Sequence, residues 1–200
     1  MASTDAIRAL SGVAVAGGIG VTVKRNSTTR FNRAVRRRIS PKQSPALTSL
    51  ARRVSYLAGP YAHPVAAAAI GSLIRLRTGG RGAGPLAASL GTLAFDNIAR
   101  FFVHQPRPPK AGPHRGRYRY AYPSGHATAA TAIAVAAVGE IVDRLSPAER
   151  KFLWASVAGI ALAVGWSRLY LDEHWMDDVV GGWVAGAGIG LGAAALSSHS

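Results

Sequence analysis

The chain contains no cysteine, so disulfide bonds, thiolate nucleophiles and cysteine-ligated metal sites are excluded. Acidic residues are also scarce: nine Asp and Glu stand against 24 Lys and Arg, which gives a formal net charge of +15. Charged residues make up only 16% of the 200 residues, whereas a soluble domain has about 25%. Hydrophobic residues reach 48%, which excludes a disordered chain. A low content of charged residues, mostly of one sign, predicts a helical membrane protein that binds anionic partners.

A strong basic excess is compatible with three classes of partner: nucleic acid, anionic lipid headgroups or a phosphate-bearing substrate. A nucleic-acid-binding domain spreads its basic residues over a soluble face. Here the basic residues are clustered, and long segments such as residues 84–93 and 127–138 contain no charged residue. The distribution favours apolar helices joined by basic connectors and argues against a nucleic-acid partner.

Apolar segments recur along the whole chain, and none alternates apolar and polar residues with the period expected of a strand. A helix of about 20 residues, rising about 1.5 Å per residue, spans the roughly 30 Å hydrocarbon core of a membrane. The chain is therefore predicted to be an all-α, multi-pass membrane bundle of about six helices, whose Ala and Gly residues allow close packing. The predicted helices are residues 6–23, 54–76 with an effective start near Ala62 because of Pro60 and Pro64, 84–103, 124–142, 152–171 and 175–196.

Basic residues are densest between residues 24 and 53, which hold ten of them. Phe31, Val35 and Ile39 recur every four residues there, with Arg33 and Arg37 between them. This spacing predicts a short amphipathic helix lying on the membrane surface, with a solvated basic connector as the alternative. We therefore expect an N-terminal helix with a basic interfacial segment, residues 1–53, and a helical core, residues 54–200.

Three groups of polar residues stand at the ends of the predicted helices. They are Arg100 with Arg107 and Pro108, the run Pro-Ser-Gly-His at residues 123–126, and Ser167 and Arg168 followed by His174 and Asp178. If consecutive helices alternate in direction, helices 84–103 and 152–171 end on the side where helices 124–142 and 175–196 begin. All three groups are then expected at one face of the membrane. Asp96, four residues before Arg100, is expected to neutralise or orient that arginine.

The side chains in these groups suit phosphate chemistry. Converging guanidinium groups bind phosphate oxygens in bidentate geometry. A helix that begins at Ser124 and Gly125 offers backbone N–H donors to an anion, and Ser124 is able to cap that helix. His174 and Asp178 are four residues apart and share a helix face, and a carboxylate on one ring nitrogen leaves the other free to attack. His126 is then available as the proton donor.

Together these groups resemble the type-2 phosphatidic acid phosphatase family, which shares its active site with the vanadium haloperoxidases. The three parts of the family pattern are found in order between residues 100 and 178: Arg100 and Arg107-Pro108, then Pro123-Ser124-Gly125-His126, then Ser167-Arg168, His174 and Asp178. Arg100 stands where Lys is usual in the family, which keeps the positive charge but changes its reach and hydrogen-bond geometry.

The resemblance implies a mechanism for these residues. His174 attacks phosphorus and forms a phosphohistidine, Asp178 orients His174, and His126 protonates the departing alcohol. The residues that bind the phosphoryl oxygens are then Arg100, Arg107, Ser124, Gly125 and Arg168. No metal and no other cofactor is implied, and the acids near the site share one short segment, residues 172–178, with no second carboxylate cluster for a two-metal site.

A membrane setting implies a lipid substrate that presents its phosphate at the interface. The candidates are phosphatidate, phosphatidylglycerophosphate, a polyprenyl phosphate or diphosphate, and a polyprenyl-linked sugar phosphate. On the predicted site side, residues 24–53 hold ten basic residues and residues 104–123 hold five, against three each in residues 75–81 and 143–151 plus Arg8 on the other side. The positive-inside rule then places the site on the cytoplasmic face of the cell membrane.

Two other functions are compatible with parts of the sequence. A haloperoxidase-like enzyme would share the arginine and histidine residues. A non-catalytic basic membrane protein that binds anionic lipids would explain residues 24–53, but not the spacing of His174 and Asp178. The sequence gives no indication of the oligomeric state.

Overall fold

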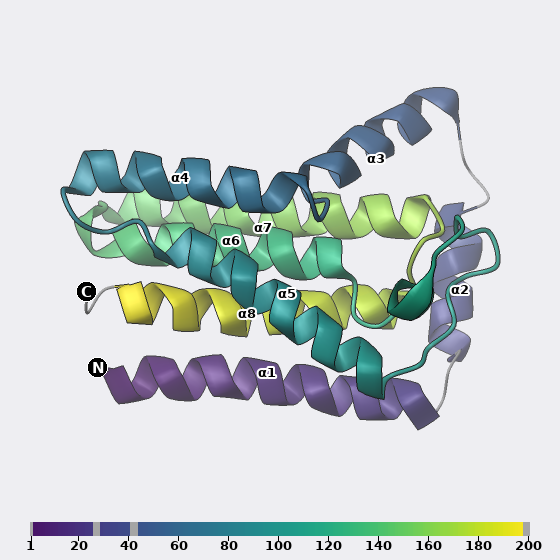
Figure 1. Ribbon diagram of the computed structural model, residues 1–200. Coiled ribbons are helices and arrows are strands. Elements are labelled where there is room, and N and C mark those ends of the chain that lie inside the picture. Colours follow the sequence, from purple (N-terminus) through teal and green to yellow (C-terminus); the bar gives the residue numbers. More distant parts are fainter. Residues whose placement is uncertain (1, 26–28, 41–43, 198–200) are drawn as a thin grey trace.

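The computed structural model describes residues 2–25, 29–40 and 44–197, so that residues 26–28 and 41–43 of the predicted basic segment lie outside the described residues. Eight α-helices follow one another in the described part (Figure 1). They are α1 (Ala2–Arg25), α2 (Arg30–Ile39), α3 (Pro45–Leu57), α4 (Ala62–Thr78), α5 (Gly84–Phe102), α6 (Gly125–Ile141), α7 (Pro147–Tyr170) and α8 (Met176–Ser197), with the short 3-10 helices η2 (Gly116–Arg119) and η3 (Val142–Arg144). Within these residues the only extended pairing is an isolated bridge between Pro106 and Tyr120, and the predicted all-α class is confirmed.

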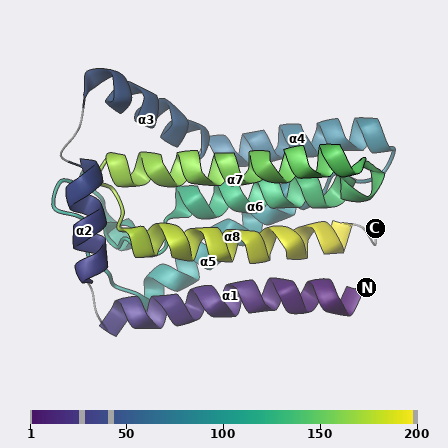
Figure 2. The same cartoon turned by 180° about the vertical axis from the view of Figure 1, so that it is seen from behind.

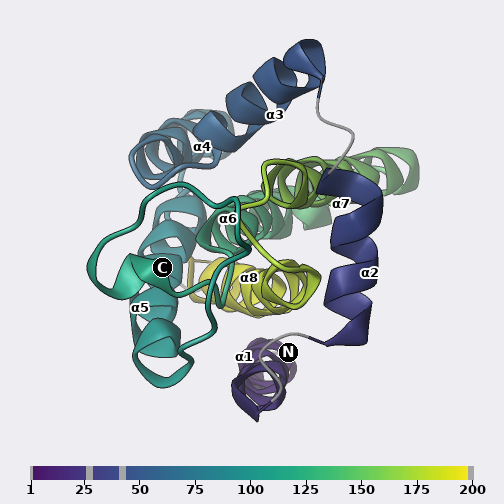
Figure 3. The same cartoon turned by 90° about the vertical axis from the view of Figure 1, so that its right-hand side faces the viewer.

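Helix α8 lies at the centre of the bundle (Figure 3). It packs against α6, α1 and α5, and α7 and α4 pack against α6. Helices α6 and α8 begin, and α5 and α7 end, at the same end of the bundle, while α8 ends at the opposite end (Figures 1 and 2). Helix α2 crosses the first end, which we call the site end. The alternation of helix direction expected from the sequence is therefore observed.

Close contact between α6 and α8 depends on glycine. Gly182, Gly186 and Gly190 recur every four residues on the face of α8 that meets α6. A Cβ atom added to Gly186 would lie 2.6 Å from the carbonyl oxygen of Thr128, and one added to Gly190 would lie 2.5 Å from that of Ala132. The two backbones are therefore in near contact, as small residues allow in membrane helix pairs.

Among the described residues, three helices are long and apolar enough to cross a membrane: α6 with η3, α7 and α8. Helices α3 and α4 qualify as a fourth span only if taken together, since they meet at a bend of 60°. Helix α5 covers the predicted crossing at residues 84–103, but it falls short of this criterion because its second half carries Asp96, Asn97 and Arg100. Large apolar side chains on its outer surface are exposed, including Ile98 and Phe101. The chain is a multi-pass membrane protein.

The basic segment contains two helices where the sequence indicated one. Helix α2 matches the predicted amphipathic stretch, but it packs through polar residues: Asn32 is buried, whereas Phe31 is 57% exposed. Helix α3 was not predicted. It begins after Ser44, whose hydroxyl accepts a hydrogen bond from the Leu47 N–H at 3.3 Å, with a proline in the first turn.

Helix α4 begins at Ala62, as expected from Pro60 and Pro64, and residues 54–57 of the predicted helix belong to α3 instead. Helix α3 continues across residue 53. The division of the chain into residues 1–53 and 54–200 stays a prediction.

Candidate active site

Two arginines extend from the end of α5 towards the other polar groups. Arg100 is 5% exposed, and its Nη2 donates to the Pro123 carbonyl at 3.0 Å and lies 3.6 Å from Asp96 Oδ2, the neutralising contact expected from their spacing. Arg107 lies in the loop after α5, where its Nη1 donates to the Glu173 carbonyl at 2.8 Å. Burial lowers the pKa of Arg107 to about 10, against the opposing effect of the Glu173 carboxylate, so the guanidinium stays charged near neutral pH.

The start of α6 is joined to the start of α8. Ser124 precedes the first turn of α6, and its N–H donates to the Asp178 carbonyl at 3.0 Å. The prediction that this N–H is open to an anion is therefore wrong, because α8 already occupies it. The predicted side-chain cap by Ser124 is also absent: its Oγ is buried and has no hydrogen-bond partner among the described residues. A Cβ atom on Gly125 would lie 2.3 Å from Asp96 Oδ2, so a larger residue here would displace the Asp96 carboxylate.

The loop between α7 and α8 carries the His–Asp pair. His174 Nδ1 lies 3.3 Å from Asp178 Oδ2, which also accepts from the Trp175 N–H at 2.8 Å. The other ring nitrogen, His174 Nε2, is 3.2 Å from Arg107 Nη1. A guanidinium is only a donor, so Nε2 carries the lone pair and Nδ1 carries the proton that points at Asp178.

The electrostatic surroundings keep His174 neutral. Burial is the main reason that the pKa of His174 lies well below its usual range, and the positive charges of Arg107 and Arg168 lower it further. A neutral imidazole with an outward lone pair is the form required of a nucleophile.

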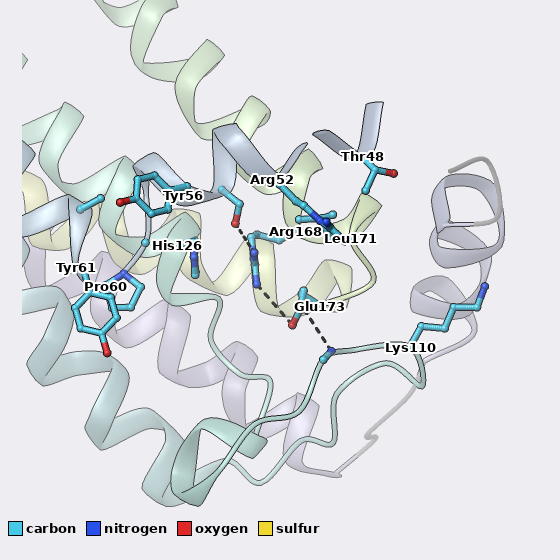
Figure 4. Close-up of a pocket in the computed structure, with 14 residues that line it drawn as sticks. Thr48, Arg52, Tyr56, Pro60, Tyr61, Lys110, His126, Arg168, Leu171 and Glu173 are labelled. Atoms are coloured by element: carbon cyan, nitrogen blue, oxygen red, sulfur yellow. Dashed lines mark hydrogen bonds and ion pairs between the residues drawn. The ribbon is translucent and has the colours of Figure 1, made fainter. Parts of the chain in front are cut away.

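Arg168, at the end of α7, completes the arrangement. It is 7% exposed, its Nη1 donates to the Ser55 hydroxyl of α3, and its Nη2 lies 3.7 Å from Glu173 Oε2. Figure 4 shows the guanidinium of Arg168 beside Glu173. Helix α3, which the sequence did not predict, therefore helps to hold an arginine of the site.

The three groups line one cavity of about 470 Å³ at the site end. Six of the residues expected at the site border it, namely Arg100, Arg107, Gly125, His126, Arg168 and His174. Ser124 and Asp178 do not border this cavity, and both residues are fully buried. A second cavity of about 560 Å³ adjoins the first, and both are lined by Pro60, Tyr61, His126 and Arg168 (Figure 4).

Some residues of the site were not found from the sequence. His63 and His114 were not among the predicted site residues, and both line the first cavity. His63 Nδ1 is 3.0 Å from Ser89 Oγ, and His114 Nε2 is 2.8 Å from Glu173 Oε2. Glu173 directly precedes His174 in the sequence, which predicts that Glu173 lies near the site but not where its side chain points.

Comparison with known proteins identifies the family. The model of the PAP2 superfamily matches residues 82–199, which include all three polar groups. The chain belongs to the PAP2 superfamily. The resemblance drawn from residues 100–178 is thereby confirmed, as is the expectation of a membrane phosphatase fold.

Two relatives of this PAP2 protein agree with that assignment. The crystal structure of a transmembrane PAP2-type phosphatidylglycerolphosphate phosphatase from Bacillus subtilis superposes with a TM-score of 0.82 over 96% of both chains, at 18% sequence identity. An undecaprenyl-diphosphatase of Sulfolobus acidocaldarius is 36% identical over 72 residues, which cover 35% of this chain and 30% of that protein. The first relative shows a shared fold, and the second shares only part of its length with this chain.

Proposed function

We propose that this PAP2 protein hydrolyses a phosphate monoester or diphosphate of a lipid through a phosphohistidine on His174. The observation that carries the proposal is the contact pattern of His174, with Asp178 at Nδ1 and Arg107 at Nε2, beside a cavity whose lining includes Arg100, Arg107 and Arg168. Both named relatives act on lipid-linked phosphates, one a phosphatidylglycerophosphate and the other an undecaprenyl diphosphate.

The first half of the reaction transfers the phosphoryl group. Phosphate oxygens bind Arg100, Arg107 and Arg168, which draws Arg107 away from His174 and frees the Nε2 lone pair. Nε2 attacks phosphorus, the bond between phosphorus and the leaving oxygen breaks, and protonated His126 donates a proton to that oxygen. The leaving oxygen belongs to the lipid alcohol of a monoester or to the lipid monophosphate of a diphosphate. The Nδ1 proton stays on the ring, where Asp178 stabilises the positive charge that develops on it.

The second half releases phosphate. His126, now neutral, takes a proton from water, whose oxygen attacks phosphorus as the bond to Nε2 breaks. Orthophosphate leaves, and both histidines return to their first state. The Ser124 hydroxyl and the Gly125 N–H at the start of α6 are the remaining donors proposed for the phosphoryl oxygens. The reaction as written uses no metal and no cofactor.

The substrate class and the intermediate are tested together. Purified protein in detergent is assayed for phosphate release from phosphatidate, phosphatidylglycerophosphate, polyprenyl phosphate, polyprenyl diphosphate and a polyprenyl sugar phosphate. Rapid quenching with a ³²P-labelled substrate should trap acid-labile, base-stable label on the wild type and none on His174→Ala. Near-normal turnover by His174→Ala would refute the proposal.

We propose further that the site faces the cytoplasm, on the basis of the excess of basic residues in residues 24–53 and 104–123. Helix α8 starts at the site end and runs away from it (Figure 1). A topology reporter fused after Ser200, which lies outside the described residues, should therefore report the far side of the cell membrane. A cytoplasmic signal would overturn this orientation.

A further inference from the structure

The carboxylate of Glu173 lies among the positive charges of the candidate site. Its Oε2 is 3.6 Å from Arg107 Nη1, 3.7 Å from Arg168 Nη2 and 2.8 Å from His114 Nε2. Its Oε1 accepts a weak hydrogen bond from the Gly112 N–H at 3.4 Å (Figure 4). The Glu173 side chain is only 20% exposed. One carboxylate thus stands between two of the three arginines to which we assign phosphate binding.

The charges around the cavity explain why a carboxylate is held there. Arg100 has its own partner in Asp96, whereas Arg107 and Arg168 have Glu173 in common. Burial opposes the ionised carboxylate, yet the hydrogen bond from His114 and the charge of Arg168 hold the pKa of Glu173 below its usual range. Glu173 is therefore an anion in the substrate-free protein.

A phosphoryl group and this carboxylate compete for the same donors. Two anions a few Å apart in a low-dielectric site repel each other strongly, so both do not pair with Arg107 and Arg168 together. The contacts of Glu173 with these arginines, at 3.6 and 3.7 Å, are longer than charge-assisted hydrogen bonds of about 2.8 Å. The two arginines therefore hold Glu173 less tightly than direct charge-assisted hydrogen bonds would, and Glu173 also lines the adjoining cavity with Arg52 and Lys110.

We propose that Glu173 is a specificity-determining residue that occupies the place of a phosphoryl oxygen between Arg107 and Arg168 and so weakens the binding of free phosphate. A lipid phosphate displaces the carboxylate because its membrane-held chain adds binding energy, whereas orthophosphate has only its charge. The same competition speeds the departure of the orthophosphate product. This inference rests on the proposed function for its role in turnover, but not for the competition itself.

Direct binding of ³²P-orthophosphate to the purified protein tests the competition without turnover. Coupling between two binding sites typically changes an affinity by about 5- to 150-fold, and for direct competition we expect Glu173→Gln to bind orthophosphate at least about tenfold more tightly than the wild type. Glu173→Ala should change affinity in the same direction. The matched control is Asp177→Asn, which removes one negative charge from the same loop and helix end, where Asp177 pairs with Asn32 of α2. It should leave phosphate affinity unchanged.

The alternative role of Glu173 predicts the opposite result. If Glu173 only holds residues 112–114 in place, both substitutions loosen the cavity and weaken phosphate binding. Equal, weaker or undetectable orthophosphate binding by Glu173→Gln and Glu173→Ala would therefore overturn the proposal.

A second measurement tests the role of Glu173 separately from the proposed phosphatase activity. In the phosphatase assay, Glu173→Gln should be inhibited by orthophosphate at concentrations lower by the same factor as in the binding experiment. It should also gain more in kcat/KM with the soluble ester p-nitrophenyl phosphate than with a lipid phosphate. If the wild type hydrolyses no lipid phosphate, the proposed function fails, and the binding experiment still decides the role of Glu173.

Discussion

The pairing of His174 with Asp178 gives a quantitative prediction for Asp178→Asn. Asp178 Oδ2 accepts two hydrogen bonds, from the Trp175 N–H at 2.8 Å and from His174 Nδ1 at 3.3 Å. An amide nitrogen in that position would leave the buried Trp175 N–H without its partner, which costs about 1–3 kcal/mol. The asparagine oxygen therefore takes the place of Oδ2, and His174 keeps its Nδ1 proton.

Asp178→Asn therefore removes the negative charge but keeps both hydrogen bonds, and the expected decrease in kcat comes from the lost charge alone. A hydrogen bond to a charged group contributes about 1.5–3 kcal/mol, and each 1.36 kcal/mol is a factor of ten in rate. If Asp178 applies this stabilisation to the cationic ring of the transition state, Asp178→Asn lowers kcat by about 10- to 150-fold. Asp178→Ala also removes control of the tautomer, a loss that costs about 10⁴-fold in other His–Asp arrangements.

The assay is the initial rate of phosphate release from the best lipid substrate at saturation. Asp177→Asn is the control, since Asp177 neighbours Asp178 in sequence but pairs with Asn32, and it should keep kcat within about twofold. Thermal unfolding in the same detergent shows whether each variant is folded. Wild-type kcat in Asp178→Asn, or a loss as large as that of Asp178→Ala, would refute the reasoning from Trp175.

Three further predictions concern pH, metals and α2. Burial and the arginines hold the pKa of His174 well below its usual range. The acidic limb of the pH profile of kcat/KM, after correction for ionisation of the substrate phosphate, should therefore lie below pH 6.5. An acidic limb above that value would contradict a neutral, buried nucleophile. EDTA should leave the rate unchanged and vanadate should inhibit, whereas a loss in EDTA that magnesium restores would refute the metal-free reaction. Arg36→Ala leaves the buried Asp172 carboxylate without its cation, at a cost of about 3 kcal/mol, and should therefore lower the Tm of thermal unfolding. The control Arg37→Ala removes an exposed arginine and should leave Tm unchanged. Equal Tm values for the two variants would show that the Arg36–Asp172 pair does not stabilise the protein.

The sequence was sufficient for those features that depend on local spacing. The four-residue interval between His174 and Asp178 predicts a shared helix face, and the two side chains are in contact. The alternation of apolar helices with short connectors likewise predicts that Arg100, His126 and Arg168 meet at one end, and all three line one cavity. Both inferences need only helix geometry.

Features that depend on contacts between distant segments were missed. Residues 45–53 of helix α3 were taken as part of the basic segment, although Ser44 and Pro45 mark the start of a helix. The orientation of the Glu173 side chain could not be predicted from the sequence either. Glu173 lies in a loop, and contacts with His114 and Gly112, about sixty residues away in the sequence, determine its side-chain position. Loop side chains are fixed by such tertiary contacts rather than by spacing.

The geometry of the candidate site is set by the packing of two helices more than by its loops. The Ser124 N–H donates to the Asp178 carbonyl where α6 and α8 begin, and from one turn further along the glycines of α8 contact the α6 backbone. A shift of α8 by one turn would move Asp178 and His174 by about 5.4 Å relative to His126, which is more than the reach of any hydrogen bond in the cavity. In a membrane, where apolar burial does not hold helices together, that register depends on close backbone contact. The glycines at positions 182, 186 and 190 therefore hold α8 in the register that places His126 and His174 on one cavity.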